Sequence, residues 1–374
     1  KMWLVLVAVG ACVSADGAEA TRRPNIVFIL TDDQRWDMMG LVQREQGERA
    51  RFPWLKTPHL DRLAEEGVRF RNAFVVNSLC SPSRATFLTG MYGHANGIVN
   101  NHTPLSGDRP NWALELRKAG YATAYFGKWH MGNQADRPGF GHVASFVGQG
   151  VYFGCKFLVN GTETKTEGYV DDVSTDFAIA FMREHKDRPF GMVVGLKATH
   201  GPFDPPPRRA NEYEGEIPRP TPNLSVRAVY LGGGATGREG DGTKINWGYL
   251  RCISGIDDNV GRVVAAIDEL GLTDDTILVF AGDNGYYLRE HQLGDKRTAY
   301  EESLRIPLLF RYPRIGARGT VVDAMVLNTD LAPTLLDLAG IPPPGPLHGR
   351  SWRPLLSGDV PPDWRKAWLY CYFR

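Results

Sequence analysis

The feature that most constrains the fold of this chain is a set of four apolar runs, each as long as one β-strand. They cover residues 25–30, 121–126, 190–196 and 276–280. Uninterrupted apolar runs are typical of strands that are covered on both faces. Apolar residues at helical spacing lie between them, at 57–66, 111–119, 173–185 and 247–270. The alternation predicts an α/β fold with a large, mostly parallel central sheet flanked by helices.

Polar residues follow each of these four runs. Asp32 and Asp33 follow the first run, Lys128 and His130 the second, His200 the third, and Asp283 and Asn284 the fourth. One polar strand end is expected by chance, but ligands of parallel sheets bind beyond the carboxyl ends of the strands. The four sets therefore predict one shared site.

The acidic members of this set suggest a metal ion. Asp32, Asp33 and Asp283 would repel one another strongly in a cleft of low dielectric unless a cation lay between them. Together with Asn284 they form an all-oxygen set, which suits Ca²⁺ first and Mg²⁺ second, whereas Zn²⁺ would call for His or Cys. An Asp-Asp pair that stood alone would be a helix cap or a solvated turn.

A second set of residues is basic. These side chains complement a tetrahedral oxyanion of sulfate or phosphate type. Each has a plainer explanation when it is taken singly: Lys296 could be a solvated charge beside Arg297, and His130 a histidine of the core. Taken together with a metal ion, the set indicates hydrolysis of an anionic ester. The set consists of Arg84, Lys128, His130, His200 and Lys296.

The stretch NSLCSPSRATFLTG, residues 77–90, predicts a helix that begins near Cys80. Pro82 suits the first turn of a helix, and Gly90 suits its end. Arg84 projects from the same face as Cys80, so the cysteine lies beside unpaired N–H groups and a guanidinium, which together attract anions. A half-buried structural cysteine is the plainer alternative. An ordinary thiol would attack sulfur poorly, so the residues alone do not identify the nucleophile.

The segment from Cys80 to Arg84, continuing to Gly90, resembles the signature of the formylglycine-dependent sulfatases of the alkaline phosphatase superfamily. The resemblance extends along nearly the whole chain. Its motifs, in order, are Thr31-Asp32-Asp33-Gln34, Gly127-Lys128-Trp129-His130, Thr199-His200-Gly201-Pro202, Gly282-Asp283-Asn284-Gly285 and Gly294-Asp295-Lys296-Arg297.

The resemblance implies an alkaline-phosphatase-like fold and an aldehyde, formylglycine, made from Cys80 by a formylglycine-generating or equivalent maturation enzyme. It implies that Ca²⁺ is bound by Asp32, Asp33, Asp283, Asn284 and modified Cys80. The groups that would hold the sulfate or the hydrated aldehyde are Arg84, Lys128, His130, His200 and Lys296. His200 is the candidate general acid and His130 has a supporting role, although the two roles could be exchanged.

Residues 78–80, 97–101 and 300–303 are similar to glycan sulfatases, especially those that remove the 6-sulfate of N-acetylglucosamine. The expected substrate is a sulfated carbohydrate, as in glycosaminoglycan or mucin degradation, but iduronate and aryl sulfatases share the same core. Two alternatives stay open: a phosphoester or phosphonate monoester hydrolase of the same superfamily, and a catalytically silent protein that binds sulfated glycans. Four tryptophans, Trp36, Trp112, Trp129 and Trp247, could stack on a sugar, although buried structural roles are commoner.

The formal charge of +1, from 43 basic and 42 acidic residues, gives no field that would recruit nucleic acid.

Residues 1–20 are expected to be an export signal, because a lysine precedes an apolar run that is followed by a small-x-small pattern. A lipoprotein cleavage at Cys12 is the minor alternative. No later run is long enough for a transmembrane segment. The expected location is periplasmic, secreted or lysosomal, depending on the host.

Three segments are expected along the chain: the signal at 1–20, a sulfatase catalytic domain at 21–345, and the start of a truncated C-terminal α+β subdomain at 346–374. A strand at 306–312 and a helix at about 330–339 are expected near the end of the catalytic domain. Residues 367–373 have strand character, so a last strand is expected there.

Overall fold

The four apolar runs form neighbouring strands of one large sheet. The computed structural model describes residues 23–133, 135–229, 246–315 and 318–373, so the expected export signal at 1–20 and Cys12 lie outside the described residues. The strands are β1 (Asn25–Thr31), β2 (Val68–Phe70), β3 (Ala73–Phe74), β4 (Ala122–Lys128), β5 (His142–Phe146), β6 (Lys156–Val159), β7 (Thr162–Lys165), β8 (Phe190–Gly195), β9 (Thr276–Gly282), β10 (Leu308–Arg311), β11 (Thr320–Val322) and β12 (Val326–Leu327).

The sheet has ten strands in the order β11-β2-β10-β9-β1-β8-β4-β5-β6-β7. Its centre, from β9 to β5, is parallel throughout, and β1 is paired with β9 on one side and with β8 on the other. Strands β10, β6 and β7 join it antiparallel. Strands β12 and β3 form a separate parallel pair. The central parallel sheet confirms the predicted α/β class.

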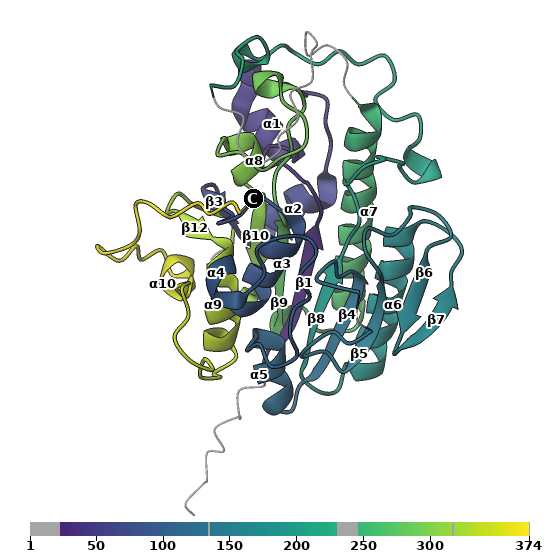
Figure 1. The fold of residues 1–374 in the computed structure, drawn as a ribbon, viewed down its shortest axis with the longest axis vertical. Helices are drawn as coiled ribbons and strands as arrows, with labels where there is room; N and C mark the ends of the chain where they lie inside the picture. Colours follow the sequence, from purple (N-terminus) through teal and green to yellow (C-terminus); the bar gives the residue numbers. More distant parts are fainter. Residues whose placement is uncertain (1–22, 134, 230–245, 316–317, 374) are drawn as a thin grey trace, which may run out of the picture.

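Helices cover both faces of the sheet, as can be followed in Figure 1. Four of them match the helical segments predicted between the apolar runs, α9 matches the helix predicted at about 330–339, and α3 begins at Cys80 as predicted. The helices are α1 (Gly40–Gln46), α2 (Pro58–Glu66), α3 (Cys80–Thr89), α4 (Gly93–Asn96), α5 (Trp112–Lys118), α6 (Val170–His185), α7 (Trp247–Glu269), α8 (Glu301–Leu304), α9 (Leu331–Leu338) and α10 (Arg353–Leu356).

The two faces of the sheet belong to two separate hydrophobic clusters. Val27 and Ile29 of β1 pack with the apolar faces of α2, α6 and α7. Ile26, Phe28 and Leu30 of the same strand pack with α3, α5 and α9 on the opposite face. Because successive side chains of a strand point to opposite faces, a strand between two helical layers must be apolar at every position. This explains the unbroken apolar runs.

The C-terminal segment differs from the prediction of a strand at 367–373, which is wrong. The segment is extended but joins no sheet, and its backbone contact is a hydrogen bond from the Cys371 N–H to the Val76 carbonyl, at 2.9 Å. Trp368 stacks on Phe74 with ring centroids 4.5 Å apart, and Tyr370 donates to the Arg297 carbonyl at 2.7 Å. Side-chain packing against the body of the protein therefore holds this segment in place of a ladder of hydrogen bonds.

Among the residues that the structure describes, no helix has the length and hydrophobicity needed to cross a bilayer.

The four cysteines in the described part, Cys80, Cys155, Cys252 and Cys371, are all unpaired thiols. Cys155 and Cys252 are buried, which is the common situation of a structural thiol.

Candidate active site

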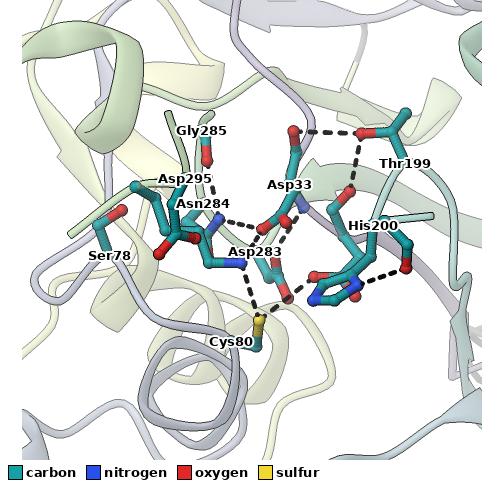
Figure 2. A network of polar contacts seen from close by, with 12 residues as sticks. Asp33, Ser78, Cys80, Thr199, His200, Asp283, Asn284, Gly285 and Asp295 are labelled. Atoms are coloured by element: carbon teal, nitrogen blue, oxygen red, sulfur yellow. Dashed lines mark hydrogen bonds and ion pairs between the residues drawn. The ribbon is translucent and has the colours of Figure 1, made fainter. Parts of the chain in front are cut away.

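The predicted site residues meet at the carboxyl edge of the parallel strands. The loops after β1, β9, β8 and β4 carry Asp32 and Asp33, Asp283 and Asn284, His200, and His130 respectively, while Lys128 is the last residue of β4. Helix α3 presents Cys80 and Arg84 to the same place, and Lys296 reaches it from the loop before α8. Figure 2 shows Asp33, Cys80, His200, Asp283 and Asn284 converging there.

The three aspartates form a compact acidic cluster. Asp32, Asp33 and Asp283 are buried, and each offers a carboxylate oxygen within 4.8 Å of those of the other two. The Asp33 N–H donates to Asp283 Oδ1 at 3.1 Å, and Asn284 Nδ2 donates to Asp33 Oδ1 at 2.7 Å. Asn284 Oδ1 is buried and has no hydrogen-bond partner among the described residues. Three carboxylates beside an unsatisfied amide oxygen fit a hard divalent cation.

The backbone of the Asp32-Asp33 turn is anchored by neighbouring elements. The Tyr249 hydroxyl, on α7, donates to the Asp33 carbonyl at 2.8 Å. The Thr199 hydroxyl, on the loop after β8, lies 3.1 Å from the Asp32 carbonyl and 3.2 Å from that of Asp33. Asp33 has a φ of 59°, in the left-handed region. These anchors hold an unfavourable turn conformation that points both carboxylates into the site.

Each aspartate also contacts a buried cation. Lys128 forms an ion pair with Asp32, and Lys296 forms one with Asp33. Arg84 Nε donates to Asp283 Oδ2 at 2.9 Å, and its Nη1 donates to the Lys128 carbonyl at 2.8 Å. The Nη2 atom of Arg84 is buried without a partner among the described residues. Each carboxylate of the site is therefore paired with a basic side chain, and Arg84 keeps an N–H donor that could bind an anion.

Burial and neighbouring charges shift the pKa values of the aspartates in opposite directions. Burial works to raise the pKa of Asp32, but the charge of Lys128 and those of nearby cations outweigh it and hold the pKa well below its usual range. Burial raises the pKa of Asp283 to about 7, and the Asp32 carboxylate adds to this rise. Carboxylates this close cannot all ionise freely, which is the electrostatic signature of a cation site.

Cys80 is the first residue of α3 and is fully buried. Its Sγ lies 3.4 Å from Asp32 Oδ1 and 3.4 Å from Lys296 Nζ. Burial, reinforced by the Asp32 charge, raises the pKa of this thiol. The side chain at position 80 therefore points into the acidic cluster and touches both halves of the site.

The two histidines are held differently. His200 Nδ1 lies 2.9 Å from the Gly201 carbonyl, and a nitrogen of its ring falls in the same compact group as Asp32 and Cys80. His130 Nε2 lies 3.2 Å from Gln149 Nε2, while its Nδ1 is buried with no partner among the described residues. Burial is the largest cause that lowers the pKa of each ring, to about 2 for His130. Burial therefore favours the neutral form of both rings.

Two cavities adjoin the site. One, of about 680 Å³, is lined by Phe203, Trp247, Tyr286 and Arg289 among others, and its wall includes parts of the loop after β8 and of the connection between β9 and α8. The other, of about 560 Å³, is lined by His130, Gln149 and Asn101. Of the four tryptophans considered for sugar stacking, Trp112 and Trp129 are fully buried, Trp36 lies under Arg305, and Trp247 lines the 680 Å³ cavity.

Sequence reasoning missed three residues that shape the site, namely Gln149, Thr199 and Tyr249. All three are uncharged, and their contacts depend on segments far apart in the chain, such as α7 against the turn after β1. The glycines on either side of Gln149, Gly148 and Gly150, indicate a turn, but nothing local marks the role of its side chain.

A mostly parallel sheet with an acidic cluster and a ring of cations at its carboxyl edge defines a hydrolase of anionic esters, as found in the alkaline phosphatase superfamily. Residues 24–341 match the sulfatase family model, and the chain belongs to the sulfatase family. It is a sulfuric ester hydrolase.

Three proteins to which this chain is similar are informative. N-acetylglucosamine-6-O-sulfatase of Bacteroides thetaiotaomicron is 32% identical over 99% of this chain and 78% of its own length. A protein solved in complex with its substrate D-glucosamine-2-N,6-O-disulfate is 30% identical with a TM-score of 0.83, over 94% of this chain and 84% of the other. A phosphonate monoester hydrolase of Silicibacter pomeroyi is 27% identical with a TM-score of 0.70, over 92% and 78%.

Proposed function

We propose that this sulfatase removes sulfate from a glycan, with N-acetylglucosamine 6-sulfate as the leading candidate, through formylglycine at position 80 and a bound Ca²⁺. The observation that carries the proposal is the contact of the position-80 side chain with both Asp32 and Lys296. A group attached there would meet the metal ligands and the cations at once. The names of two similar proteins, an N-acetylglucosamine-6-O-sulfatase and a protein solved with D-glucosamine-2-N,6-O-disulfate, support the choice of sugar.

Two groups supply the chemistry that the unmodified side chains lack. The hydrated aldehyde supplies one hydroxyl that can attack sulfur and a second through which sulfate is expelled. Asp32, Asp33, Asp283, Asn284 and residue 80 would hold the Ca²⁺ ion, which would supply positive charge beside the attacking and sulfate oxygens. The orphaned Asn284 Oδ1 and the three carboxylates support this ligand set.

The side chains of this protein bind and orient the sulfate. Lys128 and Lys296 donate to oxygens whose charge grows in the transition state, and their low exposure strengthens that interaction. Arg84, on α3, holds Asp283 in place through its Nε–H and adds positive charge to the anion site. His200 would carry a second proton, on Nε2, in the complex with the anionic substrate and would give it to the departing sugar oxygen. The cavity lined by Trp247 lies beside the His200 loop, where the sugar would lie.

We also propose that the protein is exported. Residues 1–20, outside the described part, would be the signal, residues 21–345 the catalytic domain, and residues 346–374 the first part of a C-terminal subdomain. A formylglycine-generating or equivalent enzyme would act on Cys80 before folding, because the folded protein buries that side chain completely.

The test is mass spectrometry of the peptide that contains residues 77–90, combined with a sulfate-release assay on N-acetylglucosamine 6-sulfate in Ca²⁺. We expect an aldehyde at position 80 and release of sulfate, and we expect Cys80→Ala to fold but release none. Active enzyme that carries only a thiol at position 80 would overturn the mechanism. Binding of the sugar without release, by protein that carries the aldehyde, would support the silent glycan-binding alternative.

The second candidate function is phosphonate or phosphate monoester hydrolysis, which the similarity to a phosphonate monoester hydrolase favours. Turnover of an aryl sulfate, an aryl phosphate and a phosphonate monoester by one preparation separates the two. We expect kcat/KM to be highest for the sulfate. A preference for the phosphonate would replace the proposed function with the second candidate.

A further inference from the structure

Gln149 connects two of the cationic residues, although neither charge nor spacing marked it in the sequence. It lies in the loop after β5, half-buried, and lines the 560 Å³ cavity together with His130. Its Oε1 accepts a hydrogen bond from Lys128 Nζ, and its Nε2 lies 3.2 Å from His130 Nε2. The amide of Gln149 therefore bridges Lys128, the last residue of β4, and His130, two residues later.

The Lys128 contact fixes which way the amide faces. A lysine ammonium has three donors and no acceptor, so only the amide oxygen can face it. The reversed amide would place the donor NH₂ of Gln149 against the donor NH₃⁺ of Lys128. Lys128 is itself held by its ion pair with Asp32. The amide nitrogen of Gln149 must then point to His130, where it can act only as a donor.

A donor at this position determines the tautomer of His130. Because the Gln149 N–H is donated to Nε2, that ring nitrogen carries the lone pair, and the proton of the neutral ring lies on Nδ1. Nδ1 is buried and has no hydrogen-bond partner in the described part of the chain. A buried N–H without an acceptor is unfavourable, so native proteins rarely keep one that has no function.

We propose that Gln149 is a positioning residue that holds His130 in the Nδ1–H tautomer, so that His130 acts as a hydrogen-bond donor to a sulfate or hydrate oxygen and not as a proton acceptor. The inference rests on the proposed function for the identity of that oxygen. His200 has the same tautomer but leaves the other nitrogen free: its Nδ1–H donates to the Gly201 carbonyl, so the lone pair on Nε2 is free to take up and pass on a proton. In this proposal His130 donates a hydrogen bond, and His200 transfers the proton.

The low pKa of His130, about 2 because of burial and the nearby Lys128 charge, agrees with a ring that stays neutral while it donates. A neutral donor keeps the same hydrogen bond throughout turnover, whereas a group that exchanged protons would lose it in one of its two states. This is what a fixed binding contact for a transient anion requires.

The test compares Gln149→Glu with the wild-type enzyme, both in Ca²⁺. A carboxylate at position 149 can still accept from Lys128, but it can only accept from His130 as well, so it favours a proton on Nε2. Nitrogen NMR of histidine-labelled protein reports the tautomer, and the signal that disappears in His130→Ala assigns the residue. We expect Nδ1–H in the wild type, Nε2–H in Gln149→Glu, and a fall in kcat of about 10- to 100-fold that exceeds the change in KM.

Gln46→Glu is the matched control, because it makes the same charge change on α1, away from the site. It should leave the His130 signal and kcat as in the wild type. Nε2–H in the wild type would overturn the proposal even if Gln149→Glu failed to fold, and so would an unchanged tautomer or kcat in folded Gln149→Glu. The NMR readout needs no turnover: the expected tautomers in protein that releases no sulfate would leave this inference standing and overturn the proposed function instead.

Discussion

At the scale of single residues, the site is a set of buried pairs in which each carboxylate is matched by one cation. The pair of Arg84 and Asp283 is buried on both sides and brings together residues almost two hundred positions apart. Removing one partner of a buried pair leaves an uncompensated charge and typically costs about 3 to 5 kcal/mol. Substitutions here therefore affect folding as well as chemistry, and tests of function need variants that keep the pairs intact.

His200 can be replaced without breaking a buried ion pair, because its ring bonds to the neighbouring Gly201 carbonyl. If it protonates the departing sugar oxygen, His200→Ala should lower kcat by roughly a hundredfold or more on a sugar sulfate. The same variant should lose far less on an aryl sulfate, because a phenolate leaves without a proton. Steady-state kinetics on both substrates measures the difference.

His130→Ala is the matched control for this prediction. It removes a donor to the sulfate, which both substrates share, so we expect similar losses on the sugar and the aryl sulfate. A loss that depends on the leaving group in His130→Ala, and not in His200→Ala, would exchange the two roles.

At the scale of elements, two glycines allow β4 and β8 to approach each other at the edge that carries the site. Gly127 is paired with Gly195 in the register of these strands. A Cβ on Gly195 would lie 2.5 Å from the Lys128 carbonyl, and one on Gly127 would lie 2.1 Å from the Gly195 carbonyl. Side chains there would push apart the strand ends that place Lys128 and the His200 loop.

We therefore expect Gly195→Ala to destabilise the protein by about 1 to 3 kcal/mol, because the backbone must shift, and to lower kcat more than ten-fold. Thermal melting and sulfate release measure the two effects. Gly107→Ala is the control, since its new Cβ meets nothing within 4 Å. Full activity in Gly195→Ala would show that the close approach of the strands does not matter for the site.

Helices α2 and α7 meet at a buried carboxylate away from the site. Asp257 of α7 accepts hydrogen bonds from the backbone N–H groups of His59 and Leu60, at 3.2 and 2.8 Å, at the start of α2. Burial nevertheless raises the pKa of Asp257 to about 7 from an ordinary value of 3.8. The folded protein therefore binds a proton here more tightly than the unfolded chain does.

The sign of the pH effect follows from this raised pKa. The proton stabilises the fold fully below about pH 4, and this contribution is lost as the pH rises towards 7. Between pH 5 and pH 7 the loss from this one group is about 2 to 3 kcal/mol. In Asp257→Asn this part of the pH dependence should vanish, so the difference in unfolding free energy between the variant and the wild type should change with pH.

Urea titrations of both proteins at pH 5, 6 and 7 measure this difference. Asp274→Asn, an exposed aspartate near the start of β9, is the control and should give a difference that does not vary with pH. A constant difference for Asp257→Asn as well would contradict a raised pKa at this position.

At the scale of the whole molecule, the site lies where four strand ends and one helix start converge, so it links distant parts of the chain. A ligand that binds the folded state alone stabilises it by about 2.7 kcal/mol at a hundred times its dissociation constant. Because three neighbouring carboxylates gain from an added cation, we expect Ca²⁺ to raise the melting temperature by roughly 5 °C or more above that of EGTA-treated protein. Activity should fall and return with the metal.

Mg²⁺ at the same concentration should raise the melting temperature less than Ca²⁺ does, since it dehydrates reluctantly. Asp283→Asn should lose most of the response, while Asp274→Asn should keep it. An equal or larger effect of Mg²⁺ would contradict the choice of calcium, and no response to either ion would contradict a metal site at the aspartates.

Much of the fold could be predicted because it depends on patterns that are local in sequence. The four buried strands and their helices were predicted from apolar spacing alone, and Gly90 does end α3 with a φ of 68°. The short strands β2, β3, β11 and β12 were missed because two or three residues carry no periodicity. The false strand at 367–373 has the composition of one, but its aromatic residues are used in packing against Phe74 and the Arg297 region.

The sequence by itself determined that Asp32, Asp33, Asp283 and Asn284 would meet, because parallel strands that run through one core must end at one edge. It also placed Cys80 at a helix start and included Lys296 in the cationic set. Only the tertiary structure decided which charge lies beside which, that Gln149 spans Lys128 and His130, and that the two histidines leave opposite ring nitrogens free. Those contacts join segments with no common local pattern, and a hydrogen bond depends on distances and directions that only the packed chain fixes.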